Sequence, residues 1–206
     1  MIEIIILAIT TFFIIKKLKS ILGEEHDSIY FSVDRDFKTM KDAEIIETSD
    51  DFEEKFNYLS DSAKQYTKDI CNKISGFSLE KFKTISSKVL ECVIKANDEQ
   101  NNNDIKKFLS KDLAEIVCSS FETEEKNHII LVSLNSSKIL DVVKDGSIYD
   151  IIVEFQMEQI NYTTNKDNEV IDGSKSEVIK VNEKWYFSHD FSKKDSTWFV
   201  RKIEEL

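Results

Sequence analysis

The segment at residues 147–160, SIYDIIVEFQMEQI, decides the fold class of this chain because its apolar side chains recur at every second position. The apolar positions are Tyr149, Ile151, Val153, Phe155 and Met157. Acidic or amide side chains stand between them, at Asp150, Glu154, Gln156 and Glu158. Because successive side chains of a strand point to opposite faces, this period predicts a strand with one face on a core and the other toward solvent.

The segments on either side of this strand have the same character. Apolar, β-branched runs fill residues 129–143, and the polar stretch 165–174, which contains Asp172 and Gly173, is typical of a hairpin connection. A further strand is expected to carry Ile179, Val181, Trp185 and Phe187. A turn at 193–196 and a closing strand at 198–203 follow. The C-terminal half therefore predicts consecutive antiparallel strands.

The preceding part of the chain has a helical period instead. A first helix is expected from Asp50 and Asp51, which are placed to cap it, with the stripe Phe52, Phe56, Leu59, Ala63, Tyr66 and Ile70. After Gly76, Ser78 is placed to cap a second helix with the stripe Phe82, Ile85, Val89, Cys92, Val93 and Ala96. A polar turn at 97–103 precedes a third helix, which starts at Asp104 and carries Ile105, Phe108, Leu109, Leu113, Ile116 and Val117. Helices followed by consecutive strands predict an α+β domain.

The N-terminus carries a short apolar run, IEIIILAITTFFII at residues 2–15, directly followed by lysines. A cleaved signal peptide is disfavoured because no basic residue precedes the run and no small-residue cleavage site follows it. A buried core helix fits its length, whereas a spanning helix needs about 20 apolar residues. We favour a membrane anchor formed by Ile4, Ile5, Ile6, Leu7, Phe12, Phe13, Ile14, Ile15, Lys16, Lys17 and Lys19.

The lysines that follow the run place the rest of the chain in the cytoplasm by the positive-inside rule. The predicted organisation is an anchor at 1–22, an acidic tether at 23–49 and an α+β domain at 50–206. The resulting fold class is α+β, with an N-terminal hydrophobic helix followed by helices packed on an antiparallel sheet.

Composition excludes several functions. The 206 residues carry a formal net charge of -11, which repels nucleic acid and repels anionic lipid except where lysines cluster. The three cysteines, Cys71, Cys92 and Cys118, lack the spacing of a disulfide framework or a zinc site and are expected to be reduced and buried. None of the histidines lies near a cysteine, and neither phosphate-binding glycine motifs nor a nucleophile elbow occurs. We therefore expect no metal, no cofactor and no catalytic residues.

The C-terminal part carries four recognisable motifs: an acidic turn at 169–173, the pattern Glu183-x-Trp185-x-Phe187, a charged turn at 193–195 and Trp198 before the last strand. In these motifs it resembles the family named after subunit 44 of the mitochondrial inner-membrane translocase. Residues 131–134 and 151–163 also resemble strands of that family, so the match covers about residues 75–206.

This resemblance implies a cone-like fold with a curved antiparallel sheet, similar to nuclear-transport-factor-two-like proteins. It also implies an apolar pocket between sheet and helices, peripheral membrane association and adaptor work on proteins. The chain lacks the long N-terminal region with which mitochondrial members recruit the chaperone of the import motor. Its layout resembles the bacterial branch, so we expect a single-pass or monotopic protein of the bacterial inner membrane. The expected partners are membrane lipid and inner-membrane proteins, and a homo-oligomer is a further expectation.

Five residues are the candidates for a groove that binds a partner: Phe155, Met157, Trp185, Phe187 and Trp198. Plain core packing is the alternative for each. Two other functions stay open, a module that recognises anionic lipid and a pocket enzyme using Tyr149, Asp150 and His189. Strand alternation argues against the enzyme, because it puts Asp150 on the face opposite Tyr149.

Overall fold

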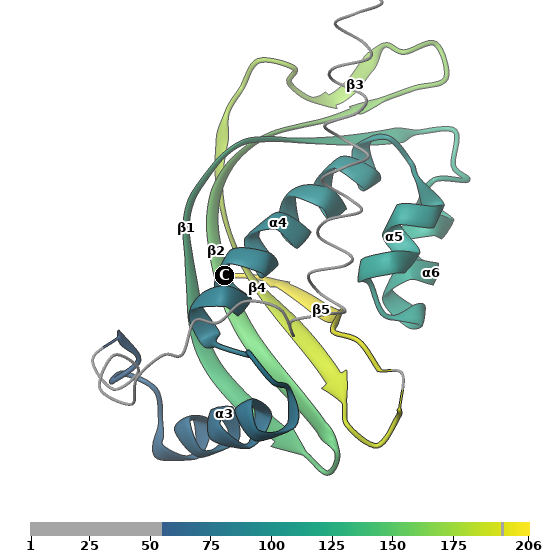
Figure 1. Cartoon of the computed structure of the whole chain (residues 1–206). Coiled ribbons are helices and arrows are strands. Elements are labelled where there is room, and N and C mark those ends of the chain that lie inside the picture. The colour runs from purple at the N-terminus through teal and green to yellow at the C-terminus, as the bar shows by residue number, and fades with distance from the viewer. Residues whose placement is uncertain (1–54, 195) are drawn as a thin grey trace, which may run out of the picture.

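The computed structural model describes residues 55–194 and 196–206, and these form helices followed by a curved sheet (Figure 1). The helices are α3 (Asp61–Lys73), α4 (Leu79–Asp98), α5 (Asn102–Phe108) and α6 (Lys111–Ser120). The strands are β1 (Lys126–Asp145), β2 (Ile148–Thr164), β3 (Val170–Gly173), β4 (Ile179–Asp190) and β5 (Phe199–Glu205). The anchor predicted at 1–22 and the tether predicted at 23–49 lie outside the described residues, and both stay predictions.

The sheet is antiparallel throughout, in the order β1-β2-β4-β5, and the short β3 pairs with the far end of β2. In the centre of the sheet, Val153 of β2 lies between Ile139 of β1 and Trp185 of β4. The register of β1 against β2 shifts at three places, and such bulges bend a strand and increase its twist. The predicted α+β class with helices on a curved antiparallel sheet is confirmed.

Helix α4 lies in the hollow of the curved sheet, with α3 toward one end and α5 and α6 toward the other (Figure 1). Every residue of its predicted apolar stripe is buried. Phe82 in its first turns packs edge-on against Phe187 and Trp198, with ring centroids 5.5 and 4.9 Å apart. The core therefore lies between α4 and the concave face of the sheet.

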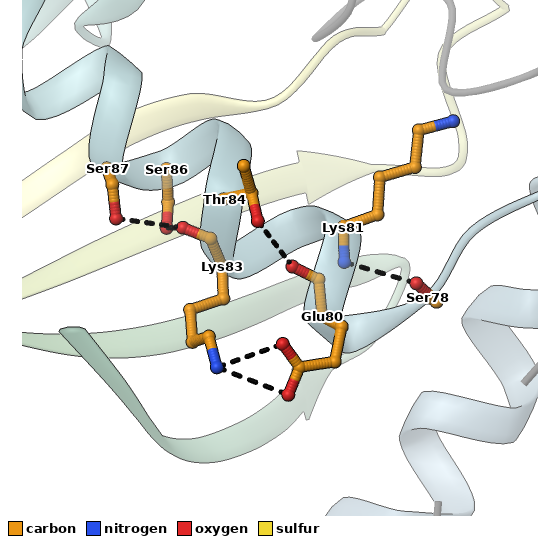
Figure 2. Close-up of polar contacts among 7 residues, drawn as sticks. All are labelled: Ser78, Glu80, Lys81, Lys83, Thr84, Ser86 and Ser87. Carbon is orange, nitrogen blue, oxygen red and sulfur yellow. Dashed lines mark hydrogen bonds and ion pairs between the residues drawn. The ribbon is translucent and has the colours of Figure 1, made fainter. Parts of the chain in front are cut away.

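The start of α4 is held by hydroxyl groups, as Figure 2 shows. Ser78 is the N-cap, as predicted, and its Oγ accepts a hydrogen bond of 3.1 Å from the backbone N–H of Lys81. Ser86 is fully buried in the helix, and its Oγ donates to the carbonyl of Lys83 at 2.9 Å. Because this hydroxyl bonds to the preceding turn, a polar side chain is tolerated inside the core.

The start of the first predicted helix, at Asp50 and Asp51, lies outside the described residues, and within them the predicted helix is interrupted between Phe56 and Ser60. α3 begins at Asp61, where Ser60 caps it by accepting from the backbone N–H of Ala63 at 3.1 Å. Phe56 and Leu59 are buried although they precede the helix. The apolar period indicated the burial of Phe56 and Leu59 correctly. The prediction of one helix through this stretch was wrong, because the backbone turns at residues 56–58 and Ser60 caps a new helix.

The third predicted helix is two helices. Leu109 leaves α5 to form a parallel bridge with Val200, and the N–H of Ser110 donates to the Val200 carbonyl at 2.8 Å. Ser110 then caps α6, and Ile116 is 68% exposed rather than part of the core stripe. A contact with the last strand therefore interrupts a locally continuous helical pattern.

Two smaller predictions also need correction. The connection predicted at 165–174 contains a strand, since Val170–Gly173 pairs with β2. Of the three cysteines, Cys92 is buried, Cys118 is half-buried and Cys71 is exposed, so the expectation that all three are buried was wrong.

Candidate functional site

The hollow between α4, α5, α6 and the sheet contains a cavity of about 190 Å³, called the inner cavity here. Its walls are mainly apolar, because the second half of α4 and the inward positions of the strands carry large aliphatic and aromatic side chains. The wall includes Val93, Val117, Gln159, Glu183, Trp185 and Ile203. An apolar, concave site with a few polar groups is the usual form of a binding site.

The principal polar feature of the inner cavity is the carboxylate of Glu183. Its Oε2 accepts a hydrogen bond of 2.8 Å from the indole Nε1 of Trp185, two residues further along the same face of β4. Burial raises the pKa of Glu183, the indole hydrogen bond lowers it, and the charge of Glu205 raises it further. The net effect is a raised pKa, which means that the folded protein holds this carboxylate at an energetic cost.

A second polar group of the inner cavity is the amide of Gln159, which is 3% exposed. Its Nε2 lies 3.0 Å from the Sδ of Met157. Since a thioether is only a weak acceptor, this amide has a weak partner inside the protein.

A larger groove of about 390 Å³, the outer groove, lies between α4 and β1 and shares Ile94 and Ile129 with the inner cavity. Its charged wall residues are Glu91, Lys95, Asp98 and Glu99. Lys95 pairs with Glu99 at 3.2 Å, and Asp98 lies 2.8 Å from Nδ1 of His128. The inner cavity and the outer groove both have largely apolar walls, and the charged residues around them are mostly acidic.

The five predicted groove residues are each at most 2% exposed. Trp185 lines the inner cavity, and Phe155 supports it from β2, with ring centroids 5.7 Å apart in a T-shaped arrangement. Phe187 and Trp198 pack around Phe82 instead, in the core. Of the five residues, Trp185 is the one that lines the inner cavity, and the other four are buried in the core. Their part in binding stays a prediction.

The sequence reasoning missed the cavity residues Glu183 and Gln159. Each had a signal, since Glu183 stands between Val181 and Trp185 on the apolar face of β4, and Gln159 continues the apolar face of β2 after Met157. A polar residue at an inward position of an alternating strand indicates either a buried hydrogen bond or a site.

The residues considered for an enzyme are divided between the two faces of the sheet. Tyr149 lies opposite His189 in the register of β2 and β4, whereas Asp150 lies opposite Ser188. Asp150 accepts hydrogen bonds from Ser188 and from the guanidinium of Arg201. This arrangement gives Asp150 a structural partner on the face away from Tyr149.

Within residues 55–194 and 196–206, no three His, Cys, Asp or Glu side chains are grouped so that they could hold a metal ion. The described helices include none with the length and apolar character that crossing a membrane requires.

Comparison with known proteins places these observations in context. A family model described as the Tim44-like domain matches residues 63–205. The mitochondrial import inner membrane translocase subunit TIM44-1 of Arabidopsis thaliana is 29% identical over 157 residues. That match covers 69% of this chain and 32% of the relative, so the chain spans about a third of the relative's length. Among solved structures, the intermembrane space region of the chloroplast protein ARC6 is similar, with a TM-score of 0.38 and 9% identity over 60% of this chain and 95% of that one.

Proposed function

This chain belongs to the Tim44-like domain family, and we propose that it is a non-catalytic adaptor that binds client proteins in protein transport or membrane-protein assembly. The inner cavity is the observation that carries this proposal, because it offers an apolar pocket without a grouped set of catalytic residues. The similarity to a translocase subunit named for mitochondrial import also supports a role in protein transport.

We further propose that the client segment enters along the outer groove and inserts an apolar stem into the inner cavity against Trp185. The linings of the outer groove and the inner cavity share Ile94 and Ile129, so the two spaces are neighbours, and the proposed segment would reach from one to the other past these side chains. Aromatic side chains such as Trp185 provide a large contact area for little loss of conformational entropy.

The N-terminal run of the sequence supports a membrane location for this work. We propose that residues 1–22 hold the protein at the bacterial inner membrane and that the folded part faces the cytoplasm, since lysines follow the apolar run. The alternative of a module for anionic lipid is less well supported, because Glu91, Asp98 and Glu99 surround the outer groove and repel an anionic headgroup.

Site-specific photocrosslinking in native membranes tests the adaptor function. Neighbouring positions of α6 provide a matched pair, since Val117 lines the inner cavity and Ile116 is 68% exposed. A photoreactive amino acid at position 117 is expected to crosslink to inner-membrane or newly made proteins, identified by mass spectrometry, whereas one at position 116 is not.

Deleting residues 1–22 tests the membrane part separately. The crosslinks from position 117 to membrane proteins are expected to disappear in the truncated protein. Equal crosslinking from positions 116 and 117 contradicts a client site in the cavity, and unchanged membrane partners after the truncation contradict the tether.

A further inference from the structure

The carboxylate of Glu183 has no cationic partner inside the described protein. None of the ion pairs among residues 55–194 and 196–206 includes it, and its hydrogen bond comes from the neutral indole of Trp185. Half-buried carboxylates are normally matched by a cation or by several strong donors, because desolvating an unpaired charge is costly.

The register of the sheet gives a reason for this absence. On the opposite face of β2, Glu154 lies across from Lys184 and Glu158 lies across from Lys180. Glu183 instead lies across from Phe155 on β2 and from another acid, Glu205, on β5. Like charges directly opposite one another destabilise a sheet, so a positive charge from outside would remove an unfavourable interaction here.

The space beside this carboxylate suits a long aliphatic stem. The inner cavity holds about 190 Å³, several times the roughly 30 Å³ that a water molecule occupies in the liquid. Its walls at Val93, Val117 and Ile203 are aliphatic. Basic side chains combine these two properties, because they bury an aliphatic stem along apolar surface and carry a charged end.

We propose that the inner cavity binds a basic side chain, lysine or arginine, of the client polypeptide, with the stem between Val93 and Ile203 and the cation on Glu183. This inference rests on the proposed function, because it names the chemistry of the client at the same cavity. It predicts that a client enters with a basic residue among apolar ones, and that an acidic residue at that position is rejected.

Three small probes of similar length, one cationic, one neutral and one anionic, test the inference. The protein is the full-length chain, held in nanodiscs of zwitterionic lipid at pH 7. The probes are n-pentylamine, which is protonated at this pH, the neutral n-pentanol and the anion n-pentanoate. With ¹⁵N-labelled tryptophan, the Trp185 indole N–H reports on the cavity because it donates to Glu183. The Trp198 indole is an internal reference, since it is buried and its Nε1 has no partner among the described residues.

The Trp185 signal is expected to titrate with n-pentylamine at about tenfold lower concentration than with n-pentanol, since a charge-assisted hydrogen bond forms in a partly dry site. n-Pentanoate is expected to be the weakest. Glu183→Gln is expected to abolish the preference for the amine, whereas Glu204→Gln, which removes the same charge from a carboxylate already bonded to Tyr186, is expected to keep it. Both variants are checked for a native spectrum first.

Equal titration by the amine and the alcohol in the unmodified protein overturns the inference, and so does a preference that survives Glu183→Gln. If the Glu183→Gln spectrum is not native, the order of the three probes on the unmodified protein decides the matter. If the probes show no preference for the amine but position 117 still crosslinks to clients, the adaptor function stands. Only the inference that the client inserts a basic side chain is then wrong. Amine selectivity without client crosslinks contradicts the adaptor function instead.

Discussion

The ion pair between Asp150 and Arg201 allows a sharp test of how this sheet is held together. It joins β2 to β5 across β4, with Ser188 of β4 between them, since Nε of Arg201 donates to Oγ of Ser188 at 3.2 Å. The side chain of Asp150 is 9% exposed and that of Arg201 is 52% exposed. The perturbation is Arg201→Met, which keeps the length of the stem and removes the charge.

The unequal exposure decides the size of the effect. Removing one partner of a fully buried pair costs about 3–5 kcal/mol, and an exposed pair contributes only about 0.2–1 kcal/mol. Arg201→Met leaves a buried carboxylate with one hydroxyl partner, so we expect a loss of about 2 kcal/mol in the free energy of unfolding. Asp150→Asn leaves a half-exposed guanidinium that water can solvate, so we expect only about 1 kcal/mol.

The assay is urea unfolding of the full-length protein, followed by the fluorescence of its two buried tryptophans. Lys202→Met is the control, because its ion pair with Glu204 is exposed and its loss should cost less than about 0.5 kcal/mol. The double variant of Asp150 and Arg201 should lose less than the sum of the two single losses. A loss for Arg201→Met no larger than that of the control refutes the reasoning.

Three further predictions concern pH, thiol chemistry and backbone conformation. Burial lowers the pKa of His189 below its ordinary 6.5, so the unfolded chain takes up a proton first as pH falls. Stability should therefore be full above pH 6.5 and decrease below it, and His189→Phe should flatten this part of a denaturation series. Burial raises the pKa of the Cys92 thiol to about 12, so a disulfide reagent at pH 8 should label exposed Cys71 quickly and Cys92 only after unfolding; equal rates in the native protein would refute this. Both Gly146 and Gly173 have positive φ. A Cβ added at Gly173 would lie 2.9 Å from the Tyr162 Cα, whereas a Cβ added at Gly146 would meet no atom within 4 Å. Gly173→Ala should therefore lower the melting temperature clearly more than Gly146→Ala.

The helices and strands of the core could be predicted because their side-chain periods are local. Each inward residue of β2 from Tyr149 to Met157 is buried, as the alternation indicated. Ser78 caps α4 as predicted, since a cap needs only its own side chain and the N–H groups of the next turn.

The predictions failed where distant segments compete with local pattern. The helical stripe through Leu109 is continuous in the sequence, yet Val200 of β5 bonds to Ser110 and separates α5 from α6. Ile116 of the same predicted stripe is exposed. A periodic pattern cannot report such a contact, because the partner lies in another part of the chain.

The candidate site was predictable only in part. Trp185 was named as a groove residue and lines the inner cavity, but Glu183 was named only as part of the family pattern and not as a site residue. The meaning of Glu183 depends on what lies across from it, and the register supplies Phe155 and Glu205 rather than a lysine.

The sequence by itself determined which side chains of α4 and β2 are buried, where α4 begins, the α+β order and the family resemblance. These follow from periods and caps that each short segment carries on its own. Only the tertiary structure decided where the third helix breaks, that Asp150 is paired with Arg201, and that an unpaired carboxylate stands at an apolar cavity. Each of these depends on the strand and helix that lie alongside, and that pairing is set by the closing of the whole sheet around α4.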